Sequence, residues 1–105
     1  MPIFDPDNPL AVEIRREMAD AYFTACKKMV DSLGALKAFD HTFATSALDG
    51  EQITRRSELL DEAGERAYFV VIQREAMQLP SFEGFFEDYE IPDEVKTRMG
   101  PKRNK

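Results

Sequence analysis

A run of six apolar residues, Ala67 to Ile72, is the feature that most constrains how this chain can fold. The rest of the chain is strongly polar and acidic, with a formal net charge of −6. A single amphipathic helix or a half-exposed strand would interrupt such a run with polar positions. The run must therefore be covered on all sides, either by the chain itself or by a second copy of it.

The residue types inside the run favour a strand, whereas its flanks favour a helix. Aromatic and β-branched side chains have high strand propensity. Residues 59–66 and 73–79 are rich in strong helix formers, and no turn signal separates them from the run. We therefore predict one continuous helix over 51–79, which Pro80 stops.

A second helical pattern covers residues 9–48, where apolar residues recur every three or four positions. Prolines at positions 2, 6 and 9 predict an extended arm over 1–8. Asn8 suits the N-cap and Pro9 the first helical position. Gly34 leaves two alternatives open, since the helix either continues through it or ends after Leu33.

The turn signal Asp49-Gly50 joins these two helices into an antiparallel hairpin. After Pro80 we predict short helices over 81–99 and a disordered basic tail over 100–105. A length of 105 residues fits one domain. The predicted fold class is all-α, a single domain over 1–105 that consists of a long helical hairpin with short C-terminal helices.

The hairpin register predicts which residues of the two helices meet. With the turn centred near position 49, Gly34 faces Gly64, and these small residues predict a close contact between the helices. Phe69 and Ile72 are predicted to face the first helix. In this register the second helix reaches back only to about Ala19. The apolar residues before that point are left uncovered: Leu10, Val12, Ile14 and Met18.

The segment 81–91 combines an aromatic face with acidic flanks. A spacing of i, i+3, i+4 and i+7 places four aromatic residues on one helical face, namely Phe82, Phe85, Phe86 and Tyr89. Such a face can dock into a groove on a partner protein, which makes it the best candidate partner-docking surface in the sequence. The alternative is that the segment folds back on its own hairpin, where it would cover the start of the first helix.

The apolar residues of helix 51–79 that point away from the first helix also need cover. The residues predicted to point away from the first helix are Tyr68, Val71 and Leu79. Pairing of two hairpins into a four-helix arrangement would bury them. We therefore predict a homodimer with Tyr68 and Val71 at the centre of its interface.

Charge and composition argue against several classes of function. A negative net charge is unusual for a nucleic-acid binder, although the C-terminus is locally basic. No apolar stretch approaches the ~18 residues that a membrane span needs, and the N-terminus has no secretory signal pattern. The single cysteine, Cys26, excludes an internal disulfide framework. We expect a cytoplasmic protein without a membrane partner.

The sequence predicts no catalytic residue, no cofactor and no metal site. Cys26 and His41 are the only cysteine and histidine, fewer than a structural zinc site requires. The first hypothesis is therefore a non-enzymatic module that acts by binding protein or by regulation. The alternative is an enzyme or small-ligand binding protein with a site between the helices near Arg74, which lies with Gln73 beside the apolar run.

Three stretches near the C-terminus carry a resemblance: Val71–Leu79, Asp88–Val95 and Arg98–Gly100. They resemble the C-terminal half of a group of small bacterial helical proteins of unknown function. The resemblance covers about a third of the chain and contains no catalytic signature. It implies a helical protein and no particular activity.

Overall fold

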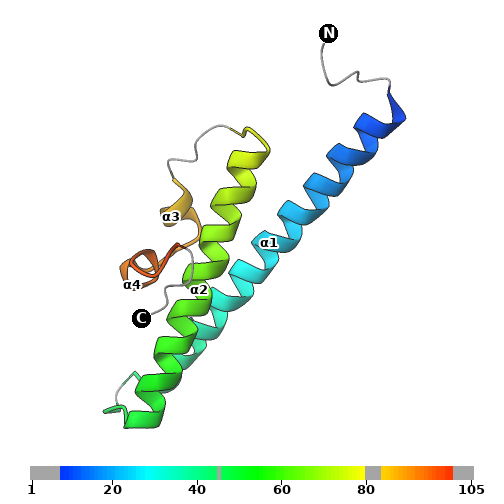
Figure 1. Ribbon diagram of the computed structural model, residues 1–105. Coiled ribbons are helices and arrows are strands. Elements are labelled where there is room, and N and C mark those ends of the chain that lie inside the picture. Colours follow the sequence, from blue (N-terminus) through cyan, green and yellow to red (C-terminus); the bar gives the residue numbers. More distant parts are fainter. Residues whose placement is uncertain (1–7, 45, 80–83, 101–105) are drawn as a thin grey trace.

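The computed structural model describes residues 8–44, 46–79 and 84–100 (Figure 1). All the regular structure in these ranges is helical. The predicted arm over 1–7 and basic tail over 101–105 lie outside the described residues.

Two long antiparallel helices are followed by two helices of a single turn (Figure 1). Their bounds are α1 Pro9–Thr42, α2 Gly50–Ala76, α3 Phe85–Asp88 and α4 Asp93–Lys96. The all-α prediction, with a long hairpin and short C-terminal helices, is confirmed. Helix α2 also contains the whole run 67–72, so the prediction that this run is helical is confirmed.

Helix α1 begins at the predicted cap, where the Asn8 side chain accepts a hydrogen bond of 2.9 Å from the backbone N–H of Leu10. It continues through Gly34, so the alternative of a break there is wrong. A lone glycine in a long helix costs only about 1 kcal/mol, which the hairpin packing offsets.

Helix α1 ends at Thr42, six residues before the predicted bound at 48. Threonine and serine compete with the helical backbone for hydrogen bonds, and Thr42 and Ser46 lie in this segment. Phe43 nevertheless keeps the helical spacing, because its backbone N–H donates to the carbonyl of Phe39 at 3.1 Å. Their rings also lie 4.6 Å apart. This contact explains why the apolar periodicity extends past the end of the helix.

Both ends of α2 are defined by local hydrogen bonds. At the start, Asp49 accepts from the backbone N–H of Gln52, and the Gln52 side chain accepts from that of Asp49, which is a capping box. At the end, Gln78 adopts a φ of 56° and the N–H of Leu79 donates to the carbonyl of Arg74. This Schellman turn stops the helix at Ala76, three residues before the predicted bound.

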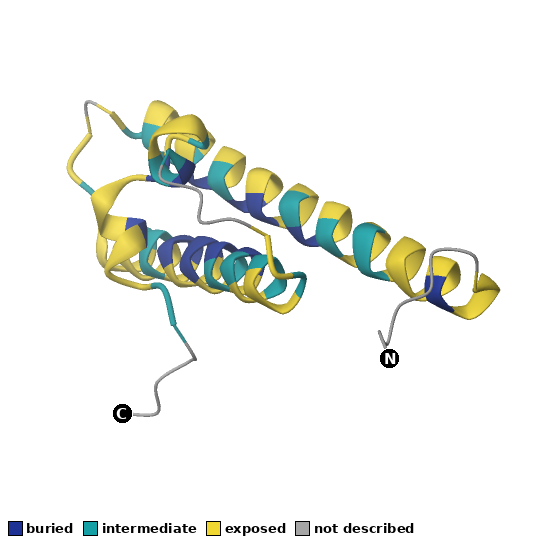
Figure 2. Ribbon diagram, turned by 90° about the horizontal axis from the view of Figure 1, so that it is seen from above, coloured by how far each residue is buried: buried dark blue, intermediate teal, exposed yellow. Residues whose placement is uncertain are grey.

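The core lies where α1, α2 and the C-terminal segment meet. Figure 2 shows the buried residues along the facing sides of α1 and α2. Met29 of α1, Val70 of α2 and Val95 of α4 are the largest fully buried side chains. Ala63 and Ala67 are also fully buried, and their small size lets the other elements approach α2 closely.

The predicted contact between Gly34 and Gly64 is wrong. Gly34 is exposed, and a Cβ atom added there would meet nothing within 4 Å. Gly64 is buried, but a Cβ added there would lie 2.6 Å from the carbonyl oxygen of Arg98. Ala63 occupies the face of α2 toward α1, and the next residue lies about 100° around the helix. Gly64 therefore makes room for the C-terminal segment.

One end of α1 extends beyond the end of α2. Two hydrogen-bonded contacts define the register of the hairpin, Arg74 with Tyr22 and Arg56 with Asp40. They are separated by 18 residues on α1 (22 to 40) and by 18 residues on α2 (56 to 74). In this register Ala76 lies opposite position 20. Residues 9–19 of α1, which we call the overhang, therefore extend past the end of α2 (Figure 1).

The described aromatic residues of the C-terminal segment do not cover the overhang, so this part of the prediction is wrong for them. Leu10 remains 67% exposed and Ile14 remains 39% exposed. After α2 the chain turns back along the hairpin, and α4 lies beside α2 (Figure 1). Tyr89 consequently lies near Tyr22 and Cys26, in the middle of α1.

Candidate functional site

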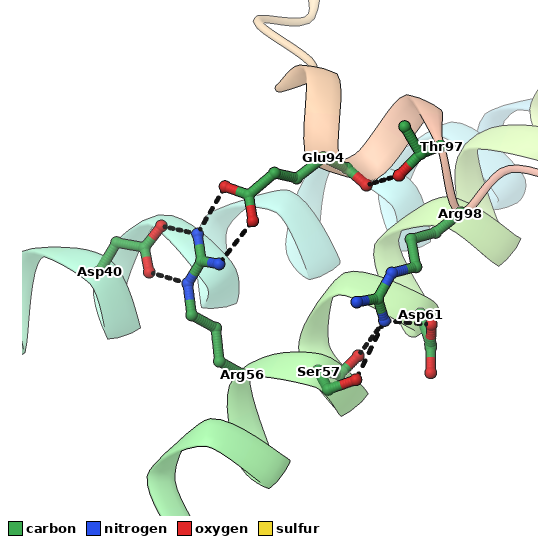
Figure 3. Close-up of polar contacts among 7 residues, drawn as sticks. All are labelled: Asp40, Arg56, Ser57, Asp61, Glu94, Thr97 and Arg98. Atoms are coloured by element: carbon green, nitrogen blue, oxygen red, sulfur yellow. Dashed lines mark hydrogen bonds and ion pairs between the residues drawn. The ribbon is translucent and has the colours of Figure 1, made fainter. Parts of the chain in front are cut away.

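Arg56 joins three helices through paired hydrogen bonds (Figure 3). Its guanidinium donates to both carboxylate oxygens of Asp40 in α1, at 2.8 and 3.0 Å. It also donates to both carboxylate oxygens of Glu94 in α4, at 2.7 and 3.0 Å. These hydrogen bonds hold the pKa values of Asp40 and Glu94 below their ordinary values. The arrangement attaches α4 to the hairpin, and the three charged side chains that form it are paired with one another.

Arg98 makes a second attachment of the C-terminal segment to α2 (Figure 3). Its guanidinium donates to Asp61 at 2.7 Å and to the hydroxyl of Ser57 at 3.0 Å. The backbone of Arg98 lies against Gly64, as described above. Figure 3 also shows the hydroxyl of Thr97 donating to the carbonyl of Glu94 within α4. These polar contacts have a structural role, since they hold the C-terminal segment in place.

The region near Arg74, the alternative site from the sequence, is a contact between helices. Arg74 donates to the hydroxyl of Tyr22 at 2.9 Å, and its guanidinium carbon lies 6.0 Å from the centroid of that ring. Tyr89 lies beside Cys26, and burial, reinforced by this thiol, raises the pKa of Tyr89. The guanidinium, two phenols and a thiol thus form a half-buried cluster whose contacts hold α1, α2 and the C-terminal segment together.

The described part of the chain contains neither a cluster of metal-ligating side chains nor a helix that could span a membrane. Within 8–44, 46–79 and 84–100, no group of three or more His, Cys, Asp or Glu side chains is placed to hold a metal ion. None of the helices in these ranges has the length and apolar character of a bilayer span.

The predicted docking aromatics fold back on the hairpin where the structure describes them. Phe85 is buried in the core, and Phe86 and Tyr89 are half-buried against it. The Phe85 ring centroid lies 5.5 Å from that of Phe86 and 5.2 Å from that of Tyr89. Phe82 lies outside the described residues. The fold-back alternative is therefore correct for these three residues, and Phe85 is not available to a partner protein.

The predicted interface residues of α2 occupy different environments. Val71 is half-buried and packs against the core of its own chain. Tyr68 is also half-buried, and Leu79 is exposed. Phe69 and Ile72, predicted to face α1, are instead exposed. The contact face of α2 runs through positions 63, 67, 70 and 74, so positions 69 and 72 are rotated away from it.

A groove runs between α1 and α2, and its lining residues lie within 20–28 of α1 and 65–73 of α2, together with Gly100 of the C-terminal segment. Its volume is about 610 Å³. Charged side chains also line it, namely Asp20, Lys28, Glu65 and Arg66. The remaining side chains are mostly small on α1 and large and apolar on α2. They include Ala21, Thr24 and Ala25 on α1, and Tyr68, Phe69 and Ile72 on α2.

The groove and the overhang together form the candidate functional surface. On α1 the apolar stripe at positions 10, 14 and 18 continues to positions 21 and 25, which line the groove. The sequence predicted the bare overhang from the register of the hairpin. It did not predict the groove, because the rotation of α2 that exposes Phe69 and Ile72 has no local signal in the sequence.

Comparison of the chain with protein-family models, with curated proteins and with solved structures finds no match. The functional argument therefore depends on the chemistry of this surface.

Proposed function

We propose that this protein is a non-enzymatic protein–protein interaction module that assembles as a homodimer. The observation that carries the proposal is the apolar surface that the fold leaves in contact with water. Nine large hydrophobic side chains are exposed in the described part of the chain. Single exposed residues of this kind are ordinary, but contiguous ones mark interaction sites.

The position of these residues supports an interaction rather than incidental exposure. Leu10 and Ile14 lie on the overhang, and Phe69 and Ile72 line the groove that begins where the overhang ends. Three arginines are engaged in contacts within the fold. Arg56 and Arg98 fasten the C-terminal segment, and Arg74 contacts Tyr22.

One observation favours the alternative of small-ligand binding. The groove volume of about 610 Å³ falls within the range of small-molecule pockets. Arg66 and Gln73 contribute polar groups to its lining, whereas Arg74 does not line it. An apolar ligand in this groove would shield the same Phe69 and Ile72 side chains that a protein partner would cover.

Light scattering coupled to size-exclusion chromatography tests the proposal. At tens of micromolar we expect a particle of twice the 12.0 kDa chain mass, with no growth beyond two copies as the concentration rises. Dilution should return monomer in a reversible equilibrium. A monomeric mass throughout this range would refute the homodimer.

A further inference from the structure

We propose that two copies of this chain exchange their overhangs, so that residues 9–19 of each copy lie in the α1/α2 groove of the other. This inference rests on the proposed homodimer and specifies its interface. Two observations support it, namely the lengths of the two surfaces and the shape of the groove, and a two-fold pairing would occupy both grooves at once.

The overhang and the groove match in length. The overhang contains 11 residues (9 to 19) and at 1.5 Å per residue is about 16 Å long. The residues that line the groove span positions 20–28 of α1 and 65–73 of α2, and nine residues of helix correspond to about 14 Å. A helical segment of this length therefore fills the groove from end to end.

The shapes of the two surfaces are also complementary. The overhang presents Leu10, Ile14 and Met18 at helical spacing, a ridge of large side chains. The small Ala21 and Thr24 on the α1 wall allow another helix to approach closely. Phe69 on the α2 wall is 47% exposed and would lie along the flank of that helix.

A two-fold axis brings both overhangs into both grooves at once. Aligning the middle of the overhang, Ile14, with the middle of the groove on α1, Thr24, makes the two α1 helices antiparallel and places the axis near Ala19. In the hairpin register Ile72 lies across from Thr24, so Ile14 of one copy lies beside Ile72 of the other. The pairing is isologous and closes at two copies.

The charges around the surface agree with this arrangement. Glu13 and Glu17 flank the apolar ridge of the overhang, and Lys28 lies at the far end of the groove on α1. In the antiparallel alignment Lys28 of one copy lies within one helical turn of Glu13 of the other. Parallel pairing would place Lys28 beside Glu17 instead, so charge alone does not set the direction of the helices. Only the antiparallel direction has a two-fold axis that closes the pairing at two copies.

Directed disulfide formation tests the exchange. In a Cys26→Ala background, a protein with Ile14→Cys is mixed with one that carries Ile72→Cys, and the mixture is oxidised mildly. We expect a covalent heterodimer, since the arrangement brings the two Cα atoms within the ~7 Å that a disulfide allows. The matched control replaces Ile72→Cys by Ile53→Cys, a position on α2 that is 56% exposed, against 38% for Ile72. It lies 19 residues away (72 to 53), or about 28 Å along the helix, and should not cross-link.

A pair of charge substitutions provides the second measurement. Ile14→Glu should raise the dimer dissociation constant by at least about tenfold, because it places a charge in the apolar groove. Phe23→Glu is the control, because Phe23 is 69% exposed and lies on the opposite side of α1 from the ridge. It should leave the dissociation constant within about twofold, since it lies outside the interface.

The outcomes separate the two proposals. A wild-type dimer that forms no bond between positions 14 and 72, or that dissociates with Phe23→Glu and not with Ile14→Glu, overturns the exchange and leaves self-association intact. A wild-type protein that stays monomeric overturns both proposals. A 14–72 heterodimer together with sensitivity to Ile14→Glu confirms the exchange.

Discussion

Two glycine-to-alanine substitutions should change the stability of this protein in opposite directions. Both glycines lie inside long helices, where alanine is preferred to glycine by about 1 kcal/mol. At Gly34 an added Cβ meets nothing within 4 Å, so Gly34→Ala should stabilise the protein by about 0.5–1 kcal/mol. At Gly64 the same methyl group would lie 2.6 Å from the carbonyl oxygen of Arg98.

The contact at Gly64 cannot be relieved by moving a flexible side chain, because the neighbouring atoms include the Arg98 backbone. The C-terminal segment must therefore shift, and overpacking of this kind costs about 1–3 kcal/mol. A larger shift would also expose Val95, whose burial contributes about 1.5–3 kcal/mol. After the gain in helix propensity, Gly64→Ala should destabilise the protein by up to about 2 kcal/mol. Because the gain in propensity is common to both, the two variants should differ by the overpacking cost, about 1–3 kcal/mol.

Urea and thermal denaturation, followed by circular dichroism at one fixed protein concentration, measure this difference. For a domain of this size 1 kcal/mol corresponds to about 4–8 °C in Tm. Hydrogen exchange should show faster opening at Val95 in Gly64→Ala and no change in Gly34→Ala. If Gly64→Ala proves as stable as Gly34→Ala, the close approach of the C-terminal segment to α2 is refuted.

Two further predictions concern Arg56. Arg56→Met should destabilise the protein by about 1–2 kcal/mol, since it removes hydrogen bonds to two carboxylates that are partly exposed, whereas the surface control Arg55→Met should stay within about 0.5 kcal/mol in the same urea titration. The pKa values of Asp40 and Glu94 are lowered in the folded state. Their contribution to the stability of the folded state is therefore complete above their unfolded pKa values, near pH 4, and is lost as the pH falls through their folded pKa values. The stability difference between wild type and Arg56→Met should therefore shrink on acidification below about pH 4, and a difference that stays constant down to pH 2 would contradict this linkage.

The helices were predictable because their signals are local. Asn8 and Pro9 mark the start of α1, and Asp49 marks the start of α2 through a capping box with Gln52. Helix formers on both sides of the apolar run outweighed the strand propensity of its residues. The end of α2 was less predictable, because its Schellman turn places Gln78 rather than glycine at the left-handed position.

The rotation of α2 about its own axis could not be predicted from apolar periodicity. Six consecutive apolar residues place apolar side chains on every side of the helix. The pattern therefore does not show which of Phe69, Val70 and Val71 faces α1. Packing decides this, since fully buried Ala63 and Ala67 continue to Val70 along one narrow face. A shift of one residue corresponds to about 100°, which is enough to exchange the exposed and the buried members of the run.

The contacts of the C-terminal segment also could not be predicted from the sequence. Asp40, Arg56 and Glu94 are far apart along the chain, and any of the 14 basic residues could pair with any of the 20 acidic ones. The three-dimensional path of the chain after α2 selects the partners. The aromatic spacing predicted that Phe85 and Tyr89 share one face, and the fold-back alternative was correct, but the part of the hairpin that they cover was predicted wrongly.

The bare overhang follows from the unequal lengths of the helices together with the place where the C-terminal segment is fastened. Helix α1 has 34 residues and α2 has 27, and the linker joins them at the end far from the overhang. The C-terminal segment could cover the overhang only by releasing Arg56 and Arg98, whose partners lie in the other half of the hairpin. Moving it would also expose Val95, which is fully buried. Because this rearrangement would break those hydrogen bonds and expose Val95, the described C-terminal segment stays away from Leu10 and Ile14, and this is the argument for the proposed dimer.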